Sequence, residues 1–370
     1  MKYARMPIEI ESPEEYGYDK IKYNLSESSV TDQTLESLDI QIPNLTLLYN
    51  EHRGSSQLRN LIVGDSGLNK DDVLITSGAA CALFIISTSQ LTPDDHLVVV
   101  RPNYATNLET PKAIGCKITY IDLQFESGFQ PDFSFIEAAI QPNTKIVSVT
   151  CPHNPTGTVM SRDTLDQLVA ITKKKNCFLL VDETYRDVHY GSQLPVAASL
   201  GDHVLSVCSM SKSFGIPGIR LGWVITQNKT LQDTFLAAKE QISISGSVID
   251  EYIAEQVLSR KSSILKSTCE EMSARLDMVA SWIDKEDLLE WVKPEGGVVC
   301  FPKMKKEPAG GTAAFYERLL TKYHTYIGPG HWFEMPDTYF RVGFGWSTRE
   351  ELQAGMEAIS KALRDENGSL

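Results

Sequence analysis

Short apolar runs alternate with longer stretches of helical pattern through the middle of this 370-residue chain. Seven such runs lie at residues 73–75, 97–100, 118–121, 146–149, 178–181, 204–207 and 221–225. Short runs rich in Val, Ile and Leu indicate strands that are buried on both faces. Their alternation with helices is typical of a mainly parallel sheet covered by helices on both sides. The sequence therefore predicts an α/β fold, in which ligands bind beyond the carboxyl ends of the strands.

The remainder of the chain predicts a second, smaller unit. Helical patterns continue after residue 225 to about residue 283, where they would link the two units. Strand patterns near residues 297–301 and 339–344, followed by a helix from Arg349, are typical of a small α+β domain. The polar N-terminal stretch shows no strong periodicity. We therefore expect an N-terminal arm or small-domain flank over residues 1–43, a large domain over 44–283 and a small domain over 284–370.

Composition and charge restrict the partners of the chain. The hydrophobic share of 42% can fill the cores of two domains, and the net charge of −13 argues against nucleic acid or an anionic membrane as partner. No segment has the pattern of a secretory signal or the length of a membrane span, so we expect a cytoplasmic protein. The seven cysteines are widely spaced and indicate reduced core residues, with neither a disulfide framework nor a metal cluster.

One lysine, Lys212, stands between two serines in the glycine-punctuated segment SMSKSFGIPGIR, residues 209–220. Burial disfavours the charged form of a lysine and so favours the amine or imine that carbonyl chemistry uses. Arg220 offers a fork of donors that matches a phosphate, and the hydroxyl of Ser209 adds another donor. The segment therefore predicts a site for a phosphorylated aldehyde cofactor. An ordinary surface loop with a solvated lysine is the alternative.

Two further polar residues lie at or just beyond the ends of predicted strands. Asn154 lies in the turn CPHNPTG, where two prolines and a glycine end the strand at residues 146–149. Asp182 follows the strand at residues 178–181, where an unpaired buried carboxylate would be costly. A protonated pyridine nitrogen would pair with this carboxylate and make the ring an electron sink.

These motifs in combination resemble the class I/II aminotransferase superfamily of fold-type I enzymes, which use pyridoxal 5′-phosphate (PLP). The resemblance spans most of the chain, from about Tyr49 to Arg341. It implies PLP as cofactor, a seven-stranded large domain and a small α+β domain. The implied roles fall on Lys212 in SMSK as Schiff-base lysine, Asp182 in DETY as partner of the pyridine nitrogen, Asn154 in NPTG and Tyr185 in DETY as ligands of the phenolic oxygen, Tyr104 in RPNY as stacking ring, Ser209 and Arg220 as phosphate ligands, and Arg341 in YFRVGF as the arginine that binds the substrate carboxylate.

The segment from Val73 to Phe84 supports one more phosphate contact. It reads as a strand, a glycine turn and a helix of small and apolar residues. Helix N-termini bind phosphate well, and the resemblance implies that the backbone N–H groups of Ala79 and Ala80 do so here. An ordinary strand-to-helix turn is the alternative.

Two other residues have a structural alternative beside the implied role. Tyr49 lies in YNEHRGSSQLR, which is similar to a family segment whose tyrosine reaches the phosphate of the neighbouring subunit, so the resemblance implies a homodimer with shared sites. A half-buried surface aromatic is the alternative. Arg341 could be an ion-paired structural arginine, but its neighbours Phe340, Val342 and Phe344 favour a desolvated site for a carboxylate.

The implied reaction is transamination between an L-α-amino acid and a 2-oxo acid. Arg341 would hold the substrate carboxylate, Asn154 would also face the substrate, and the freed amine of Lys212 would remove the α-proton to give a quinonoid. Asp182 and Tyr185 would support this chemistry on the cofactor. The distal side chain of the substrate is left open, because no second arginine can be assigned to it.

The same scaffold serves other reactions. The turn that contains His153 and the Gly-Gly-Val segment at residues 296–301 look similar to those of capreomycidine-synthase-like enzymes, which eliminate and cyclise, and PHNP turns also occur in carbon–sulfur lyases of this fold. β- or γ-elimination, replacement or cyclisation is therefore the alternative function. His153 is a candidate pocket residue, with local packing as its alternative. A non-catalytic binding protein would need neither Lys212 nor Asp182.

Overall fold

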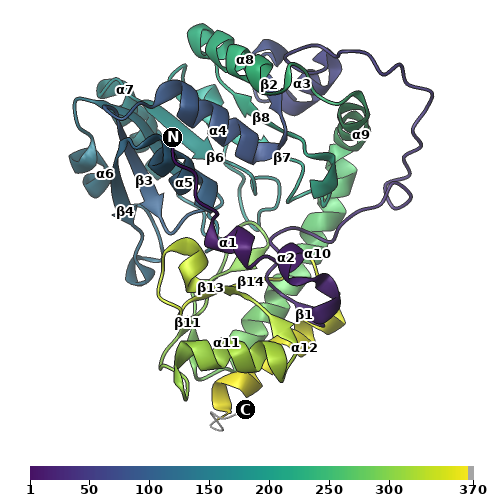
Figure 1. Ribbon diagram of the computed structural model, residues 1–370, viewed down its shortest axis with the longest axis vertical. Helices are drawn as coiled ribbons and strands as arrows, with labels where there is room; N and C mark the ends of the chain where they lie inside the picture. Colours follow the sequence, from purple (N-terminus) through teal and green to yellow (C-terminus); the bar gives the residue numbers. More distant parts are fainter. Residues whose placement is uncertain (366–370) are drawn as a thin grey trace.

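A single large sheet dominates the computed structural model, which describes residues 1–365 (Figure 1). Its strands follow the order β2-β8-β7-β6-β5-β3-β4, and β8 alone runs antiparallel to its two neighbours. The strands are β2 (Val73–Thr76), β3 (His96–Arg101), β4 (Lys117–Asp122), β5 (Thr144–Thr150), β6 (Phe178–Asp182), β7 (Val204–Ser209) and β8 (Gly222–Ile225). They coincide with the seven predicted runs, so the prediction of a mainly parallel α/β sheet is confirmed.

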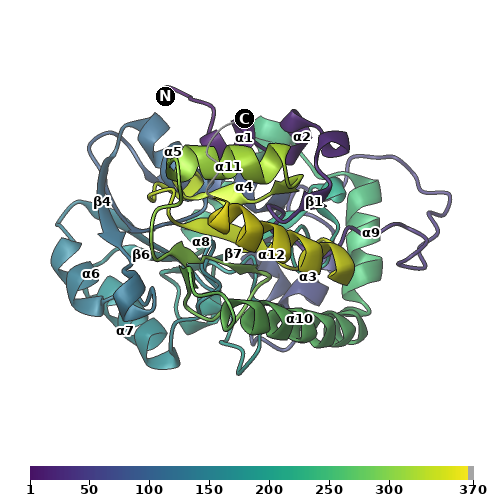
Figure 2. The same cartoon turned by 90° about the horizontal axis from the view of Figure 1, so that it is seen from below.

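Helices cover both faces of this sheet (Figures 1 and 2). Successive strand residues point to opposite faces, and both faces are apolar because neither meets water. Val99 and Leu180 pack toward α4 (Gly78–Gln90), α5 (Ala105–Ile114) and α8 (Lys229–Ser243). Their chain neighbours Val98 and Leu179 pack toward α6 (Phe133–Ala139) and α7 (Arg162–Lys174) on the other face.

The C-terminal part of the chain is a smaller α+β arrangement. Helices α9 (Val248–Leu258) and α10 (Lys261–Ile283) lead into it from the large sheet (Figure 1). It contains β9 (Leu289–Glu290), β10 (Val299–Cys300), β11 (Lys303–Met304), α11 (Gly311–Thr321), β12 (Thr325–Tyr326), β13 (Gly328–Pro329), β14 (Phe340–Gly343) and α12 (Arg349–Arg364). The predicted strands and closing helix are therefore present, whereas the domain boundaries at 43/44 and 283/284 stay a prediction.

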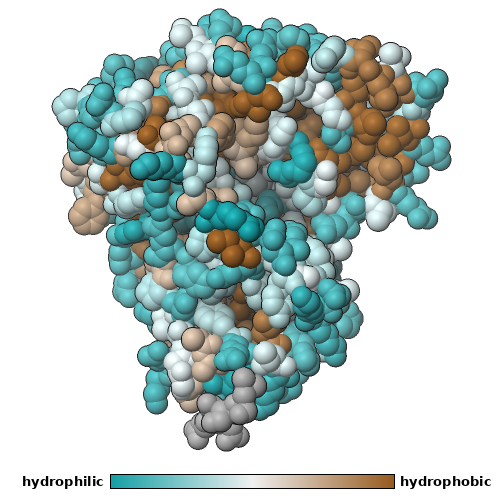
Figure 3. Space-filling model, in the orientation of Figure 1, coloured by the Kyte–Doolittle hydropathy of each residue, from teal (hydrophilic) through white to brown (hydrophobic). Residues whose placement is uncertain are grey.

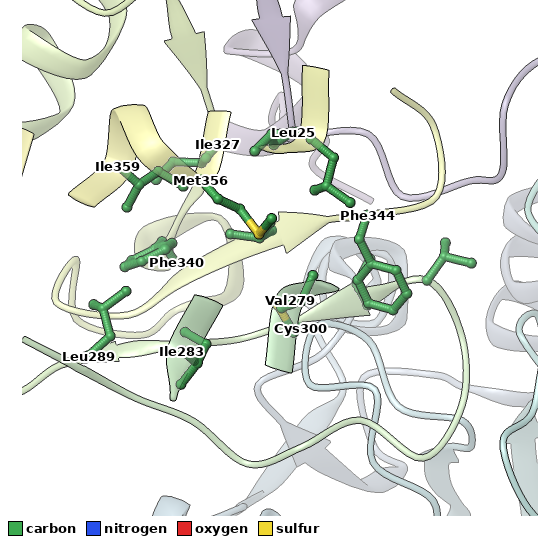
Figure 4. Packing of buried hydrophobic residues seen from close by; sticks show 14 of the residues in the cluster. Leu25, Val279, Ile283, Leu289, Cys300, Ile327, Phe340, Phe344, Met356 and Ile359 are labelled. Carbon is green, nitrogen blue, oxygen red and sulfur yellow. The ribbon is translucent and has the colours of Figure 1, made fainter. Parts of the chain in front are cut away.

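The N-terminal residues join this C-terminal part. Strand β1 (Tyr23–Asn24) pairs in parallel with β12, and Leu25 is fully buried in the same apolar cluster as Phe340, Met356 and Ile359 (Figure 4). A Cβ atom on Gly343 would lie 1.6 Å from the carbonyl oxygen of Glu27, so only glycine lets the arm lie this close to β14. The packing therefore fixes residues 26–28 at the border between the C-terminal part and the large sheet.

Three short helices and one extended segment complete the fold. Helices α1 (Pro7–Ile10) and α2 (Pro13–Tyr16) lie at the junction between the large sheet and the C-terminal part (Figure 1). Residues 41–53 run as an extended segment before α3 (Ser56–Val63) and extend outward from the body (Figures 1 and 2). Within residues 1–365, no helix has both the length and the apolar character needed to cross a membrane.

Candidate active site

A cavity of about 350 Å³ lies between the carboxyl ends of the central strands and the N-terminal arm. Ten of the predicted site residues line it: Ala79, Ala80, Tyr104, Asn154, Asp182, Tyr185, Ser209, Lys212, Arg220 and Arg341. Strand ends bring them together, since β5, β6 and β7 are parallel neighbours and end at the same edge of the sheet. A larger cavity of about 440 Å³, lined by Arg186, Tyr190 and Leu276 among others, holds none of these residues.

One corner of the cavity is built for an anion. Ser77, the N-cap residue of α4, makes no side-chain hydrogen bond to the first turn, which leaves the N–H groups of Ala79 and Ala80 for a ligand. The guanidinium of Arg220 lies against Gly78, where a Cβ atom would be 2.6 Å from its Nη2. Arg220 is held by hydrogen bonds from Nη1 to the Pro217 carbonyl oxygen (2.9 Å) and to Ser211 Oγ (3.4 Å). These donors fit a phosphate group.

The buried carboxylate of Asp182 lies deeper in the same cavity. Its Oδ1 accepts hydrogen bonds from the backbone N–H and the hydroxyl of Thr184 (3.1 and 2.6 Å), and its Oδ2 accepts one from Asn107 Nδ2 (3.2 Å). Burial raises the pKa of Asp182, and no lysine or arginine within residues 1–365 forms an ion pair with it. A protonated ring nitrogen would supply the missing positive charge, which fits the pyridine ring of PLP.

Lys212 projects from the loop after β7 and contacts the arm. Its Nζ donates a hydrogen bond to Ser28 Oγ at 2.9 Å. Burial lowers the pKa of Lys212 and the positive charge of Arg341 lowers it further, whereas Glu27 and Glu14 act in the opposite direction. The lowered pKa makes the neutral amine, which is the form that bonds to a carbonyl carbon, easier to reach than in a solvated lysine.

Arg341 on β14 is only 3% exposed, yet it has no carboxylate partner in the described part of the chain. Its Nη1 donates to Asn154 Oδ1 (3.1 Å), its Nη2 donates to the Ser26 carbonyl oxygen (2.8 Å), and the Phe333 ring lies 5.0 Å from its guanidinium carbon. Its Nε has no hydrogen-bond partner within residues 1–365. A buried arginine with an unmet donor fits a carboxylate ligand better than a structural ion pair.

Tyr185 closes another wall of the cavity. Its hydroxyl donates to the Ser28 carbonyl oxygen at 2.7 Å, and its ring lies against Gly297, where a Cβ atom would be 3.3 Å from the ring. The Gly-Gly-Val segment therefore lies behind Tyr185 and outside the lining of the cavity. Its small residues make room for the tyrosine.

His153 also lies outside the lining of this cavity. Its Nε2 donates to the Pro102 carbonyl oxygen (2.9 Å), and its Nδ1 contacts Thr156 Oγ1 (2.7 Å). Burial lowers its pKa to about 4, so the ring stays neutral at physiological pH. The local-packing alternative for His153 is therefore the one that the structure favours.

Tyr49 is the predicted site residue that does not join the others. It lies on the extended segment 41–53 and is 78% exposed. Within one chain it does not line the cavity, so its implied role requires a second subunit.

Sequence reasoning missed the contribution of the N-terminal arm. Ser26, Glu27 and Ser28 line the cavity, together with Glu14 and Trp332. The local sequence gave no signal for this contribution, because the stretch is polar without strong periodicity and its burial is seen only in the fold.

An α/β sheet that gathers a partly buried lysine, a buried carboxylate and an anion-binding helix start around one cavity defines a fold-type I PLP-dependent enzyme. The sequence pattern of the family "Aminotransferase class I and II" matches residues 21–359, and the chain belongs to this family.

Individual relatives agree with this assignment. The chain is 28% identical over 293 residues to capreomycidine synthase of Streptomyces vinaceus, which covers 79% of this chain and 74% of the relative. A PLP-dependent aminotransferase from Streptococcus suis superposes with a TM-score of 0.90 at 27% identity, over 98% of each chain. The PLP-dependent cyclase OrfR superposes with a TM-score of 0.89 at 25% identity, over 98% of each chain. The chain is therefore a PLP-dependent enzyme whose relatives include both aminotransferases and a cyclase.

Proposed function

We propose that the chain is an aminotransferase that moves the amino group of an L-α-amino acid to a 2-oxo acid. The observation that carries the proposal is the convergence of Lys212, Asp182 and Arg341 on one cavity, next to an anion-binding corner at the start of α4. Lys212 and Asp182 serve the cofactor and Arg341 serves a carboxylate, which is the feature common to all α-amino acids.

The residues divide the work as follows. Bound PLP supplies an aldehyde that bonds to amines and a ring that draws electrons from the carbon attached to that nitrogen. The N–H groups of Ala79 and Ala80, with Ser209 and Arg220, would hold its phosphate, and Tyr104 would stack on its ring. Asn154 and Tyr185 would donate to its phenolic oxygen, for which the Tyr185 hydroxyl would turn its proton away from the Ser28 carbonyl oxygen. Asp182 would keep the ring nitrogen protonated.

Lys212 and Arg341 act on the substrate. Arg341 would bind the α-carboxylate, and its hydrogen bond to Asn154 (3.1 Å) orients the guanidinium for this role. Burial lowers the pKa of Lys212, which favours its role as the base that would take the proton from Cα and hold it for return.

Cyclisation, or elimination and replacement at the β or γ carbon, is the second candidate. The same groups remove the α-proton in either case, and the resemblance to capreomycidine synthase and to the cyclase OrfR supports this branch. Which branch follows depends on groups that face the side chain of the substrate.

A homodimer with shared sites belongs to the proposal. Exposed apolar residues gather on and near the extended segment, namely Leu47, Leu48, Tyr49, Ile242, Ile244 and Ile249. Figure 3 shows a brown apolar patch at the upper right, where the extended segment lies. Large exposed apolar patches mark interaction sites, and a second copy seated there would bring its own Tyr49 toward this cavity. We place the enzyme in the cytoplasm, which its free cysteines support.

The decisive experiment adds a panel of amino acids to the PLP-loaded enzyme without any 2-oxo acid. Absorbance is followed and the products are identified by mass spectrometry. Conversion of the lysine-bound cofactor to its aminated form, with one 2-oxo acid per site, is expected for an aminotransferase. Repeated turnover that releases ammonia, a leaving group or a cyclised amino acid would overturn transamination in favour of the second candidate.

A further inference from the structure

The cavity has more negative than positive side chains left over once the proposed roles are assigned. Its lining contains the cations Lys212, Arg220 and Arg341 and the carboxylates Glu9, Glu14, Glu27 and Asp182. In the proposed roles, the cofactor takes Lys212, Arg220 and Asp182. The α-carboxylate of the substrate takes Arg341. Three glutamates of the N-terminal arm remain, and no described cation of the lining is left for an acidic substrate side chain.

Glu27 has a fixed place between the two residues that act on the substrate. Its neighbour Ser26 accepts the hydrogen bond from Arg341 Nη2 through its carbonyl oxygen (2.8 Å). Its other neighbour, Ser28, accepts the one from Lys212 Nζ through Oγ (2.9 Å). A substrate held by Arg341 next to Lys212 therefore lies within the field of the Glu27 carboxylate.

One carboxylate oxygen of Glu27 has no hydrogen-bond partner among the described residues. Its Oε1 accepts from Tyr18 Oη (2.9 Å) and from Asn24 Nδ2 (3.4 Å), whereas its Oε2 accepts no hydrogen bond from any residue within 1–365. Burial raises the pKa of Glu27, and the positive charges of Lys212 and Arg341 lower it only in part. A further cation at Oε2 would stabilise the carboxylate.

The neighbouring wall fits the apolar stem of a long basic side chain. Ile8, Pro13 and Trp332 line the cavity beside Glu14. The indole N–H of Trp332 donates to Glu11 Oε2 at 2.6 Å, which fixes the plane of the ring. Basic side chains lay their methylene stems on apolar surface and keep the charged end at a polar one.

The cavity also holds an independent sign of a ligand. Arg341 is 3% exposed and lines the cavity, and its Nε lacks a partner within the described residues. The donor for an α-carboxylate and the acceptors for a cation thus lie in one cavity, as an amino acid with a basic side chain requires.

We propose that Glu27, assisted by Glu14, binds the guanidinium or ammonium group at the end of the substrate side chain. The substrate class is then the L-α-amino acids with a basic side chain. This inference rests on the proposed function, because it assumes that Arg341 holds the α-carboxylate.

The test measures the amino-acid concentration that gives half of the maximal absorbance change of the PLP-loaded enzyme. This change reports the first step with the amino acid, which every reaction branch shares. L-arginine is paired with its neutral analogue L-citrulline, L-lysine is paired with L-norleucine, and L-glutamate is added separately. The wild type is expected to prefer at least one basic member over its neutral analogue by about tenfold or more. A preference for neutral or acidic members overturns the inference and leaves the proposed function intact. No change with any amino acid overturns the proposed function, and the inference falls with it.

Variants of the N-terminal arm test whether Glu27 and Glu14 cause the preference for basic amino acids. Glu27→Gln is expected to lower the basic-over-neutral ratio by about tenfold, and Glu14→Gln to lower it roughly twofold because Glu14 is exposed. Glu15→Gln is the matched control, since Glu15 is on the same helix, pairs with Arg5 (3.4 Å) and does not line the cavity. If Glu27→Gln lowers the rate equally for basic and neutral amino acids, Glu27 acts through Lys212 and does not contact the substrate side chain. That result would overturn its role in specificity.

Discussion

Lys212 and Ser28 lie 184 positions apart in the chain and meet in a hydrogen bond of 2.9 Å from Nζ to Oγ. The N-terminal arm is thereby part of the active-site wall. Burial of residues around Leu25 in the C-terminal core holds the arm in this place. The predictions below follow from this arrangement.

Replacement of Lys212 by alanine is expected to abolish the visible absorbance of the lysine-bound cofactor and to lower turnover by at least on the order of 10³-fold, because the chain loses its proton acceptor. Absorbance spectra and steady-state rates measure both effects. Ser28→Ala, which removes only the hydrogen-bond acceptor, should keep the absorbance band. Normal turnover by Lys212→Ala would remove this lysine from the mechanism.

Lys212→Met is expected to stabilise the cofactor-free protein at neutral pH. Burial lowers the pKa of Lys212 in the folded state below its ordinary value of 10.5, so the unfolded chain binds the extra proton between these two values. The wild type therefore gains stability as the pH rises through this window, and the advantage of the variant shrinks as the pH approaches 10.5. Urea unfolding at about pH 7 and about pH 10 measures the difference. An equal gain at both values would contradict a lowered pKa.

Asp182→Asn is expected to lower the rate by on the order of 10²-fold, because an amide no longer stabilises a positive ring nitrogen. Cofactor should still bind through the corner formed by α4 and Arg220. Equilibrium binding of PLP and single-turnover rates separate the two effects. A variant with unchanged single-turnover rates would show that the carboxylate has no part in the chemistry.

Tyr49→Ala should weaken PLP binding even though Tyr49 lies outside the cavity of its own chain. If the tyrosine serves the partner, mixed dimers of Tyr49→Ala and Lys212→Ala contain one site with both residues intact. Unfolding and refolding an equal mixture should then restore about a quarter of the wild-type sites. The assay is run at limiting PLP, and the two variants refolded separately are the control. Activity equal to the sum of the separate variants would argue against shared sites.

The large sheet and most of the site could be predicted because they depend on local patterns. Each strand of the large sheet contains an apolar run. Asp182 and Ser209 end their strands, and Asn154 lies in the turn that follows β5. Parallel strands end at one edge, so the order of motifs along the chain was enough to predict that they meet. His153 shows the limit of this reasoning, since its proximity to Asn154 in the chain did not bring it into the cavity.

The sequence by itself determined the fold class, the cofactor and the residues that follow strand ends, because each depends on a short segment and on the direction of a parallel sheet. The tertiary structure alone decided that residues 26–28 line the cavity and contact Lys212 and Arg341. These contacts join residues more than 180 positions apart. They arise from packing of the arm against β14 and α12, which no local pattern encodes.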